Sequence, residues 1–349
     1  MLSKNKTLPQ KNITKILIRG TNWIGDAIMT LPAVESIRAT FPRAHIVVLA
    51  KPAVADIYKY FSTANEVIIY KNKFDNAFGV FLLAKLLRKR NFDAAILLQN
   101  AIEAAIITLF ARIPIRAGYD SDGRGIFLTH SVRRTREIRK VHQIDYYLEM
   151  VKALGCASVS KIIHLETKIN RADAQAVLEK YIPDRQKAVI GIAPGATYGP
   201  AKRWFPERFA ALADKIADTY SCQIILLGGK SDQLVAEEVK NNSRTKLINL
   251  AGQTTLQEAI YLISQCHLFI SNDSGLMHVA GALNIPTIAI FGSTNPVTTA
   301  PAGYQSVIVR KDVPCSPCFK TKCPTDFNCM KLISVEDVFA AVQNILKKV

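Results

Sequence analysis

A carboxylate, Asp26, stands where a short apolar strand (16–19) passes through a turn into a predicted helix (26–40). A helix N-terminus stabilises an ionised carboxylate. An ionised carboxylate can accept a proton from a substrate hydroxyl, as a general base does. On spacing alone, the commoner role for an aspartate at this place is to cap the helix. The residue type and position therefore offer two roles for Asp26, a helix cap or a general base.

The turn before Asp26 does not match a phosphate-binding loop. Gly20 and Gly25 have the glycine spacing of a P-loop, G-x4-G-K-[ST], but Asp26 and Ala27 stand in place of Lys and Ser or Thr. A dinucleotide fingerprint would need a glycine at position 22, which is Asn. A carboxylate here would repel a phosphate, so we expect no nucleotide at this loop. The failed fingerprint also argues against a nicotinamide dehydrogenase.

A second loop follows a predicted strand (189–193) and combines a glycine turn, a hydroxyl and two cations. Gly195 permits close approach of the backbone to a ligand. Thr197 can donate to a phosphate oxygen, and Lys202 with Arg203 can neutralise a diphosphate. The plain alternative is a solvated loop with ordinary surface cations.

A third loop, at 272–275, leads from another predicted strand into a helix. Asp273 or Ser274 is expected to cap this helix, so that the amides of Ser274 and Gly275 face an anion. His278 lies on the same face one turn on, although a lone histidine there is more often a core residue. Asp273 could accept hydrogen bonds from sugar hydroxyls. Two anion-binding loops in one domain indicate a site for a nucleotide diphosphate that carries a polyhydroxylated group.

Only parallel strands whose carboxyl ends lie at one edge of a sheet would bring these loops together. The sequence predicts two successive series of such strands. Strands are predicted at 16–19, 45–49, 67–70 and 94–98, then at 189–193, 223–227, 267–271 and 286–291, with helices between them. This alternation predicts an α/β fold with parallel sheets covered on both faces. The length of 349 residues suggests two domains. We expect two Rossmann-like, doubly wound domains facing across a cleft, at 1–170 and 171–333, with a final helix (334–349) that could pack back on the first.

Positive charge is concentrated in the first half of the chain. The chain has 45 Lys and Arg against 28 Asp and Glu, a formal net charge of +17. Residues 1–170 carry +13 of this charge and residues 171–349 carry +4. The excess indicates that the first half faces an anionic partner, whether nucleic acid, an anionic membrane surface or a phosphorylated substrate.

Four of the seven cysteines form a cluster, Cys315-x2-Cys318-x4-Cys323-x5-Cys329. Such a cluster in an intracellular chain suggests metal more than disulfides. The spacing is irregular, so the alternatives are a structural zinc site and a Pro-rich loop with reduced thiols. The polar, basic N-terminus lacks the apolar core of a signal peptide, and no stretch of about 20 apolar residues predicts a membrane span. We therefore expect a cytoplasmic protein.

Several stretches, in order from about residue 15 to the end, carry a resemblance to a known family. They are GTNWIGDAIMTLPA, PGATYGPAKRWF, LLGGKSD, NLAGQTTLQEAI, SNDSGLMHVAGAL, IFGSTNP and the cysteine segment PCSPCFKTKCP. With them the chain resembles the ADP-heptose:lipopolysaccharide heptosyltransferases, and it is most similar to the type II members. The PGA-x-x-GPAKRW motif distinguishes this chain from the type I members.

The resemblance implies a GT-B fold and an inverting transfer that needs no cofactor and no metal. It makes Asp26 the general base. It places Thr197, Lys202, Asp273, Ser274, Gly275 and His278 on the ADP-heptose donor. From their place in the second loop, we expect Gly195 and Arg203 to join them. Asp232, after the turn at 228–229, is a candidate contact for the ribose. The acceptor would be the lipid A–Kdo–heptose core at the cytoplasmic face of the inner membrane, to which the protein would be peripheral. Candidate acceptor-binding cations lie in two separate parts of the first half. They are Arg133, Arg134 and Arg136 in the run 133–140, and Lys85, Arg88, Lys89 and Arg90.

Two rival functions remain open on the sequence. The first is another nucleotide-sugar transferase of the same architecture in cell-surface glycan assembly, since no residue decides between heptose and hexose donors. The second is a basic nucleic-acid-binding protein, suggested by the charge and by the run 133–140. No known nucleic-acid module accompanies that run, so we expect no nucleic-acid partner.

Overall fold

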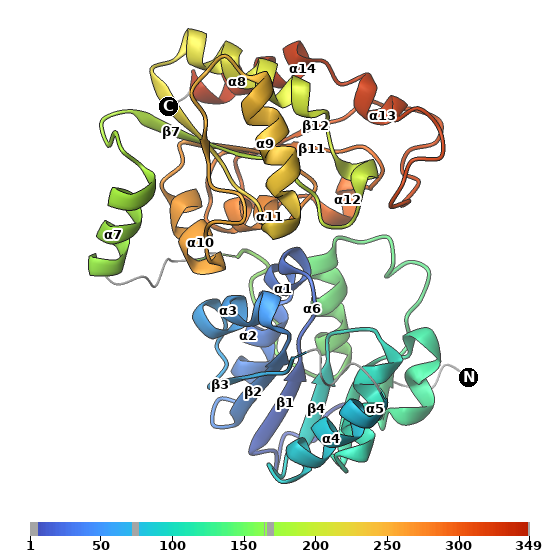
Figure 1. Cartoon of the computed structure of the whole chain (residues 1–349). Helices are drawn as coiled ribbons and strands as arrows, with labels where there is room; N and C mark the ends of the chain where they lie inside the picture. Colours follow the sequence, from blue (N-terminus) through green and yellow to red (C-terminus); the bar gives the residue numbers. More distant parts are fainter. Residues whose placement is uncertain (1–5, 72–76, 164, 166–170, 348–349) are drawn as a thin grey trace. The chain divides into compact units, whose positions relative to one another are not determined.

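The computed structural model describes residues 6–71, 77–163, 165 and 171–347, and the chain divides into two compact units (Figure 1). The first unit comprises Met1–Ile163 and the second His164–Val349. The boundary precedes the one predicted at residue 170, and the C-terminal helix belongs to the second unit. Among the described helices, none has both the length and the apolar character needed to cross a membrane.

Parallel strands form the sheet of the first unit, in the order β3-β2-β1-β4-β5-β6. They are β1 (Lys15–Arg19), β2 (His45–Ala50), β3 (Glu66–Ile69), β4 (Ala94–Leu97), β5 (Ile115–Tyr119) and β6 (His130–Val132). The apolar central strands β1, β2 and β4 are almost entirely buried, as expected for a parallel sheet covered on both faces. The strand order reverses between β1 and β4, which is where doubly wound sheets bind ligands.

The helices of the first unit lie on the two faces of this sheet (Figure 1). They are α1 (Ile24–Met29), α2 (Leu31–Thr40), α3 (Pro52–Phe61), α4 (Ala77–Arg88), α5 (Ile102–Phe110) and α6 (Gln143–Ala153), with the 3-10 helix η2 (Ser121–Phe127). The helix predicted over 26–40 is in fact two helices. Pro32 suits the first turn of α2, but within a longer helix it would remove a hydrogen bond. The chain therefore breaks at Thr30, whose hydroxyl donates to the carbonyl of Ala27 (2.7 Å).

The second unit repeats the strand order of the first. Its parallel sheet has the order β12-β11-β10-β7-β8-β9. The strands are β7 (Ala188–Ala193), β8 (Cys222–Leu226), β9 (Ile248–Asn249), β10 (Leu268–Asn272), β11 (Thr287–Ile290) and β12 (Ser306–Val309). The reversal of order falls between β7 and β10, so the loops that follow these two strands lie at the ligand-binding place of the sheet.

The helices of the second unit cover both faces of its sheet (Figure 1). They are α7 (Arg171–Tyr181), α8 (Pro206–Thr219), α9 (Gln233–Asn242), α10 (Leu256–Ser264), α11 (Gly275–Ala282), α12 (Pro296–Thr299), α13 (Asn328–Lys331) and α14 (Val335–Leu346), with the 3-10 helices η3 (Pro200–Lys202) and η4 (Lys230–Asp232). The C-terminal helix α14 packs on α8 and β12 of its own unit.

Alternate side chains of the second sheet enter two different cores. Ile288 and Ile290 of β11 join the core beneath α8, α9 and α14. Ala289, which lies between them, packs with Met277 of α11 on the opposite face. This alternation is the period of two that a strand imposes, and it explains why both faces of β11 are apolar.

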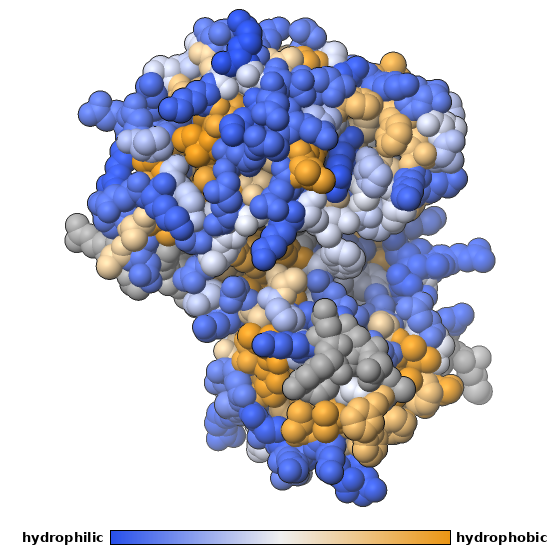
Figure 2. Space-filling view, viewed as in Figure 1, coloured by the Kyte–Doolittle hydropathy of each residue, from blue (hydrophilic) through white to orange (hydrophobic). Residues whose placement is uncertain are grey.

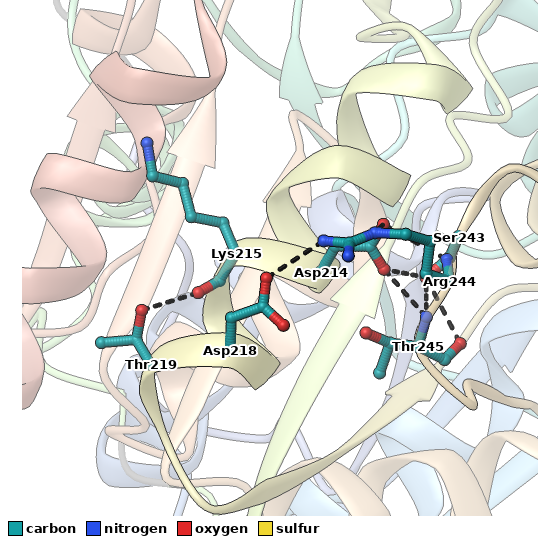
Figure 3. Close-up of polar contacts among 7 residues, drawn as sticks. All are labelled: Asp214, Lys215, Asp218, Thr219, Ser243, Arg244 and Thr245. Atoms are coloured by element: carbon teal, nitrogen blue, oxygen red, sulfur yellow. Dashed lines mark hydrogen bonds and ion pairs between the residues drawn. The ribbon is translucent and has the colours of Figure 1, made fainter.

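A hydrogen-bonded carboxylate fastens the segment before β9 to α8 (Figure 3). Asp214 of α8 accepts hydrogen bonds from the Ser243 hydroxyl (2.7 Å) and from the amides of Thr245 (2.9 Å) and Arg244 (3.2 Å). The Arg244 guanidinium also pairs with Asp214 (3.4 Å) and with Asp218 (3.1 Å). Burial opposes ionisation of Asp214, but the hydrogen bonds outweigh it and lower the pKa of this carboxyl below its usual range.

The Asp214→Asn variant is expected to lose about 1–3 kcal/mol of stability at pH 7, because asparagine cannot accept all of these donors. The lowered pKa of Asp214 stabilises the fold above about pH 3.9, the unfolded value, and this contribution is lost as pH falls through the folded value. Thermal melts from pH 7 to pH 3 test both points. The exposed Asp218→Asn control should change stability by less than about 0.5 kcal/mol. Equal losses in the two variants would contradict the prediction.

Candidate active site

The loops after β7 and β10 are tied together by one buried amide side chain. The Asn272 amide donates to the carbonyl of Pro194 (2.7 Å), and its oxygen accepts the backbone N–H of Trp204 (2.9 Å). Asn272 ends β10, and its two partners belong to the loop that follows β7. Asn272 begins the third loop of the sequence, but no role was predicted for it. A polar residue at the end of an apolar strand, LFISN, is the signal that could have identified it.

Lys202 and Asp273, both predicted to bind the donor, form a close ion pair. Lys202 Nζ lies 2.6 Å from Asp273 Oδ2, and the Thr294 hydroxyl donates to the same oxygen (2.6 Å). The two side chains are 13% and 4% exposed. The Lys202 ammonium also lies 4.8 Å from the centre of the Tyr198 ring. One carboxylate oxygen is thus already occupied, so Asp273 holds the lysine in place and has only the other oxygen for a sugar hydroxyl.

Arg203 turns toward Asp232, which sits in the loop after β8. Its guanidinium lies 3.8 Å from Asp232 Oδ1 and donates to the carbonyl of Ala196 (3.3 Å). Asp232 Oδ2 accepts the backbone N–H of Gly229 (3.0 Å). Asp232 Oδ1 is buried with no hydrogen-bond donor among the described residues. These contacts bring the loops after β7 and β8 together beside the Lys202–Asp273 pair.

Gly195 is required because the Asp232 side chain occupies the space of a Cβ. A Cβ on Gly195 would lie 2.2 Å from Asp232 Cγ, whereas one on Gly229 would lie no closer than 3.8 Å to any atom of Asp232. Gly195→Ala is therefore expected to cost about 1–3 kcal/mol of stability and to weaken nucleotide binding by displacing Asp232. Gly229→Ala is the matched control and should change neither. Similar melting temperatures and nucleotide affinities for the two variants would refute the close contact.

The N-terminus of α11 completes this group of loops. Ser274 is the N-cap residue, but its hydroxyl contacts Ser271 Oγ (3.0 Å) rather than capping the helix. The amides of the first helical turn, beginning at Gly275, have no intrahelical partner and can meet an anion. His278 is buried one turn further on, and Thr197 is exposed on the loop after β7. The predicted donor residues thus come from adjoining loops at one edge of the sheet.

The cysteine segment folds over the loop after β7. The Thr321 carbonyl accepts the amide of Ala201 (3.1 Å), and the Phe319 carbonyl accepts the Tyr198 hydroxyl (2.7 Å). Gly199 has a φ of +154°, and a Cβ there would lie 2.4 Å from the Thr321 carbonyl oxygen. The segment therefore fixes the course of the chain that leads to Lys202.

The four clustered cysteines are free thiols of differing exposure. Cys315 is exposed, Cys318 and Cys323 are half-buried, and Cys329 is buried. Burial raises the pKa of Cys329, and the other three thiols add to the effect. In the ranges that the structure describes, no three His, Cys, Asp or Glu side chains are arranged to hold a metal ion. The zinc site suggested by the spacing therefore stays a prediction without structural support.

Asp26 lies in the first turn of α1, just after β1, at the reversal point of the first sheet. Trp23 is the N-cap residue of α1, so Asp26 stands inside the helix rather than at the cap position. Its carboxylate charge is close enough to Tyr147 of α6 to reinforce the burial that raises the pKa of that phenol well above its usual value. The position suits the helix dipole, which favours an ionised carboxylate in the first turn.

Two buried residues, neither of them predicted from the sequence, hold the loop that leads to Asp26. The Arg19 guanidinium donates to the Gly20 carbonyl, to the Tyr70 hydroxyl and to the Asn22 side chain (3.0 Å). The Tyr58 hydroxyl accepts the amide of Thr21 (3.1 Å). A charged residue that ends an otherwise apolar strand, ILIR, was the available signal for Arg19.

The three predicted acceptor cations occupy different surroundings. The Arg134 amide donates to Asp120 Oδ1 (2.7 Å), and its guanidinium lies 5.6 Å from the centre of the Tyr146 ring. The Tyr146 hydroxyl donates to Asn100 Oδ1 (3.1 Å), in the loop after β4. Arg134 is therefore linked to the reversal point of the first sheet, whereas Arg133 and Arg136 are exposed on the loop after β6.

Comparison with known proteins identifies relatives along most of the chain. Residues 80–327 match glycosyltransferase family 9 (heptosyltransferase). Lipooligosaccharide heptosyltransferase 2 of Haemophilus ducreyi is 33% identical over 318 residues, covering 85% of this chain and 88% of that protein. Lipopolysaccharide heptosyltransferase 2 of Escherichia coli K12 is 29% identical over 308 residues, with the same coverage.

Solved structures of heptosyltransferases and of family 9 glycosyltransferases have the same fold as this chain. The ADP-heptose lipopolysaccharide heptosyltransferase II of E. coli superposes with a TM-score of 0.81 at 26% identity, covering 96% of this chain and 99% of that one. A family 9 glycosyltransferase from Veillonella parvula has a TM-score of 0.85 at 23% identity, covering 99% and 100%. The expected GT-B architecture of two Rossmann-like domains is thus confirmed.

Proposed function

Because the chain belongs to glycosyltransferase family 9, the heptosyltransferases, we propose that it transfers heptose from ADP-heptose to the first heptose of the lipopolysaccharide inner core. It is a glycosyltransferase, and its relatives assign it to type II. The observation that carries the donor proposal is the buried Lys202–Asp273 pair between the loops after β7 and β10. This is the edge at which a doubly wound sheet binds a nucleotide.

The donor diphosphate is held by positive charge from the second unit. Lys202, Arg203 and the amides at Ser274 and Gly275 face it, and Thr197 adds a hydroxyl donor. As the bond to ADP breaks, negative charge gathers on the diphosphate and these groups stabilise it. The transfer needs no metal, because cations and amides supply the charge that a metal would. Gly195 and Asp232 shape the loop, His278 supports α11 from the core, and the free oxygen of Asp273 orients a donor hydroxyl.

Asp26 acts as the general base in this mechanism. It takes the proton of an acceptor hydroxyl while that oxygen bonds to the anomeric carbon of the donor heptose. The bond from this carbon to the diphosphate breaks, and its electron pair leaves with ADP. Attack from the face opposite ADP inverts the anomeric configuration. Domain closure would bring Asp26 to the donor.

The acceptor is a phosphorylated and carboxylated lipid, which suits the positively charged first unit. Arg133, Arg134 and Arg136 bind its anionic groups, with the lipid A–Kdo–heptose core at the cytoplasmic face of the inner membrane. The protein is peripheral to that face. Near an anionic surface each such cation contributes about 1 kcal/mol.

A transfer assay with defined donors tests the proposal. The purified protein is given ADP-heptose or common UDP-sugars, with lipopolysaccharide that ends at its first heptose, and the product is analysed by mass spectrometry and NMR. We expect heptose transfer with inverted configuration, unchanged by EDTA. Transfer from UDP-hexoses alone would favour the rival glycan transferase. A salt-sensitive gel shift without transfer would favour the nucleic-acid-binding protein.

A further inference from the structure

Helix α4 of the first unit carries apolar side chains on its solvent face as well as on its buried face. Leu83, Ala84 and Leu87 are buried in the core beneath it. Phe78 is 75% exposed and Phe81 is 58% exposed, and Leu82 and Leu86 are also exposed. The exposed residues recur at the spacing of one helix face, so they form a stripe rather than scattered positions. Figure 2 shows hydrophobic residues gathered on this part of the first unit.

A hollow beside this stripe extends the apolar surface. It measures about 650 Å³ and lies between α4 and β3, the edge strand of the sheet. Apolar side chains form most of its lining, namely Val67, Ile68, Ile69, Leu83, Leu86 and Leu87. Lys71, Arg90 and Glu66 also line it, and Arg90 pairs with Glu66, so the hollow joins an apolar interior to charged side chains of which Lys71 adds positive charge.

The charged side chains on α4 itself and just beyond it are of one sign. Lys85, Arg88 and Lys89 are exposed on α4 and just beyond it, and residues 77–92 contain no Asp or Glu. Arg90 pairs with Glu66 of β3. An apolar helix face flanked by exposed cations, which have no acidic partner among the described residues, is complementary to an anionic bilayer surface that offers acyl chains and phosphates together. A second copy of this face would oppose cation to cation, which disfavours a dimer through it.

We propose that the exposed face of α4, with the hollow beside β3, docks on an anionic lipid bilayer. Phe78, Phe81, Leu82 and Leu86 enter the boundary between headgroups and acyl chains, and Lys85, Arg88 and Lys89 contact lipid phosphates. The inference deepens the proposed function, because a lipid-anchored acceptor must be met at such a surface. It assigns membrane contact to α4, separately from the loop at 133–136 that binds the acceptor.

Vesicle flotation with the full-length chain tests the docking directly. We use vesicles of phosphatidylethanolamine with phosphatidylglycerol, and phosphatidylcholine vesicles for comparison. Wild-type protein should bind the anionic vesicles, and Phe78→Ser with Phe81→Ser should weaken that binding at least tenfold. Lys85→Ala with Lys89→Ala should weaken vesicle binding about fivefold per cation and reduce the salt dependence of that binding. Leu234→Ser with Leu332→Ser, which alters exposed leucines of the second unit, should bind as the wild type does.

Two acceptors separate this inference from the proposed function. The Phe78→Ser, Phe81→Ser variant should transfer normally to a deacylated, soluble core oligosaccharide, which also shows that it is folded, and poorly to acceptor in vesicles. Wild-type transfer combined with unchanged vesicle binding by this variant would overturn the docking and leave the function standing. Vesicle binding without transfer to either acceptor would overturn the function alone. Self-association of the wild type in place of vesicle binding would assign the face to a second copy and overturn the proposal.

Discussion

Replacing Asp26 by asparagine is expected to lower kcat for heptose transfer about 10²- to 10⁴-fold, the usual contribution of a general base. Asparagine keeps the size of the side chain in the first turn of α1 but cannot take the acceptor proton. The affinity for ADP should stay within about twofold, because the proposed donor-binding groups belong to the second unit. Steady-state kinetics with purified acceptor, together with calorimetry of ADP binding, measure the two quantities separately.

Asp56→Asn on α3 provides the matched control for this substitution. It removes another half-buried carboxylate of the same unit and should leave kcat unchanged. Thermal melts of both variants check that the fold is kept. If Asp26→Asn turned over near the wild-type rate with ADP binding intact, the assignment of Asp26 as the base would fall. The carboxylate would then have only a structural role in the helix.

Replacing Lys202 by methionine is expected to weaken ADP binding about 10- to 100-fold, since a hydrogen bond to a charged group contributes about 1.5–3 kcal/mol. It should also lower stability by about 3 kcal/mol, because Asp273 is 4% exposed and would lose its cation. The hydrogen bond from Thr294 remains and limits the loss. Calorimetry with ADP and denaturant unfolding measure the two effects.

A double variant separates these two consequences of losing Lys202. Lys202→Met with Asp273→Asn removes both charges, so stability should return toward that of the wild type while ADP affinity stays low. Lys240→Met, on the surface of α9, should change neither property. Unchanged ADP affinity in Lys202→Met would remove this residue from the donor site, whatever the change in stability.

The central strands of both sheets could be predicted because each is an uninterrupted apolar run that is buried on both faces. The structure confirms strands at β1, β2, β3, β4, β7, β8, β10 and β11 within a residue or so of the predicted positions. Strand β5 was not predicted, because its sequence IRAGY interrupts the apolar run with Arg and Gly. The short strands β6, β9 and β12 toward the sheet edges were not predicted either. Two to four partly buried residues leave too weak a pattern to separate a strand from a loop.

The residues of the candidate site could be found from the sequence, but their pairing could not. Each loop shows its own glycine, hydroxyl or charge beside a strand. Lys202 and Asp273 are 71 positions apart, however, and only the neighbouring positions of β7 and β10 bring them into contact. Local patterns likewise gave no sign that Tyr58 supports the loop before Asp26. The roles of these residues in catalysis and binding stay predictions.

The carboxamide of Asn272 has a thermodynamic consequence for the two loops of the candidate site. Because its hydrogen bonds join both loops within the fold itself, the entropy of ordering them is lost when the chain folds and not again when a nucleotide binds. Folding of the second unit therefore bears the entropic cost of ordering these loops, and the affinity for the proposed donor is higher as a result. A nucleotide that meets such a rigid receptor should bind with a small change in backbone hydrogen exchange, and the protein's tolerance of mutation should be lowest where that rigidity originates.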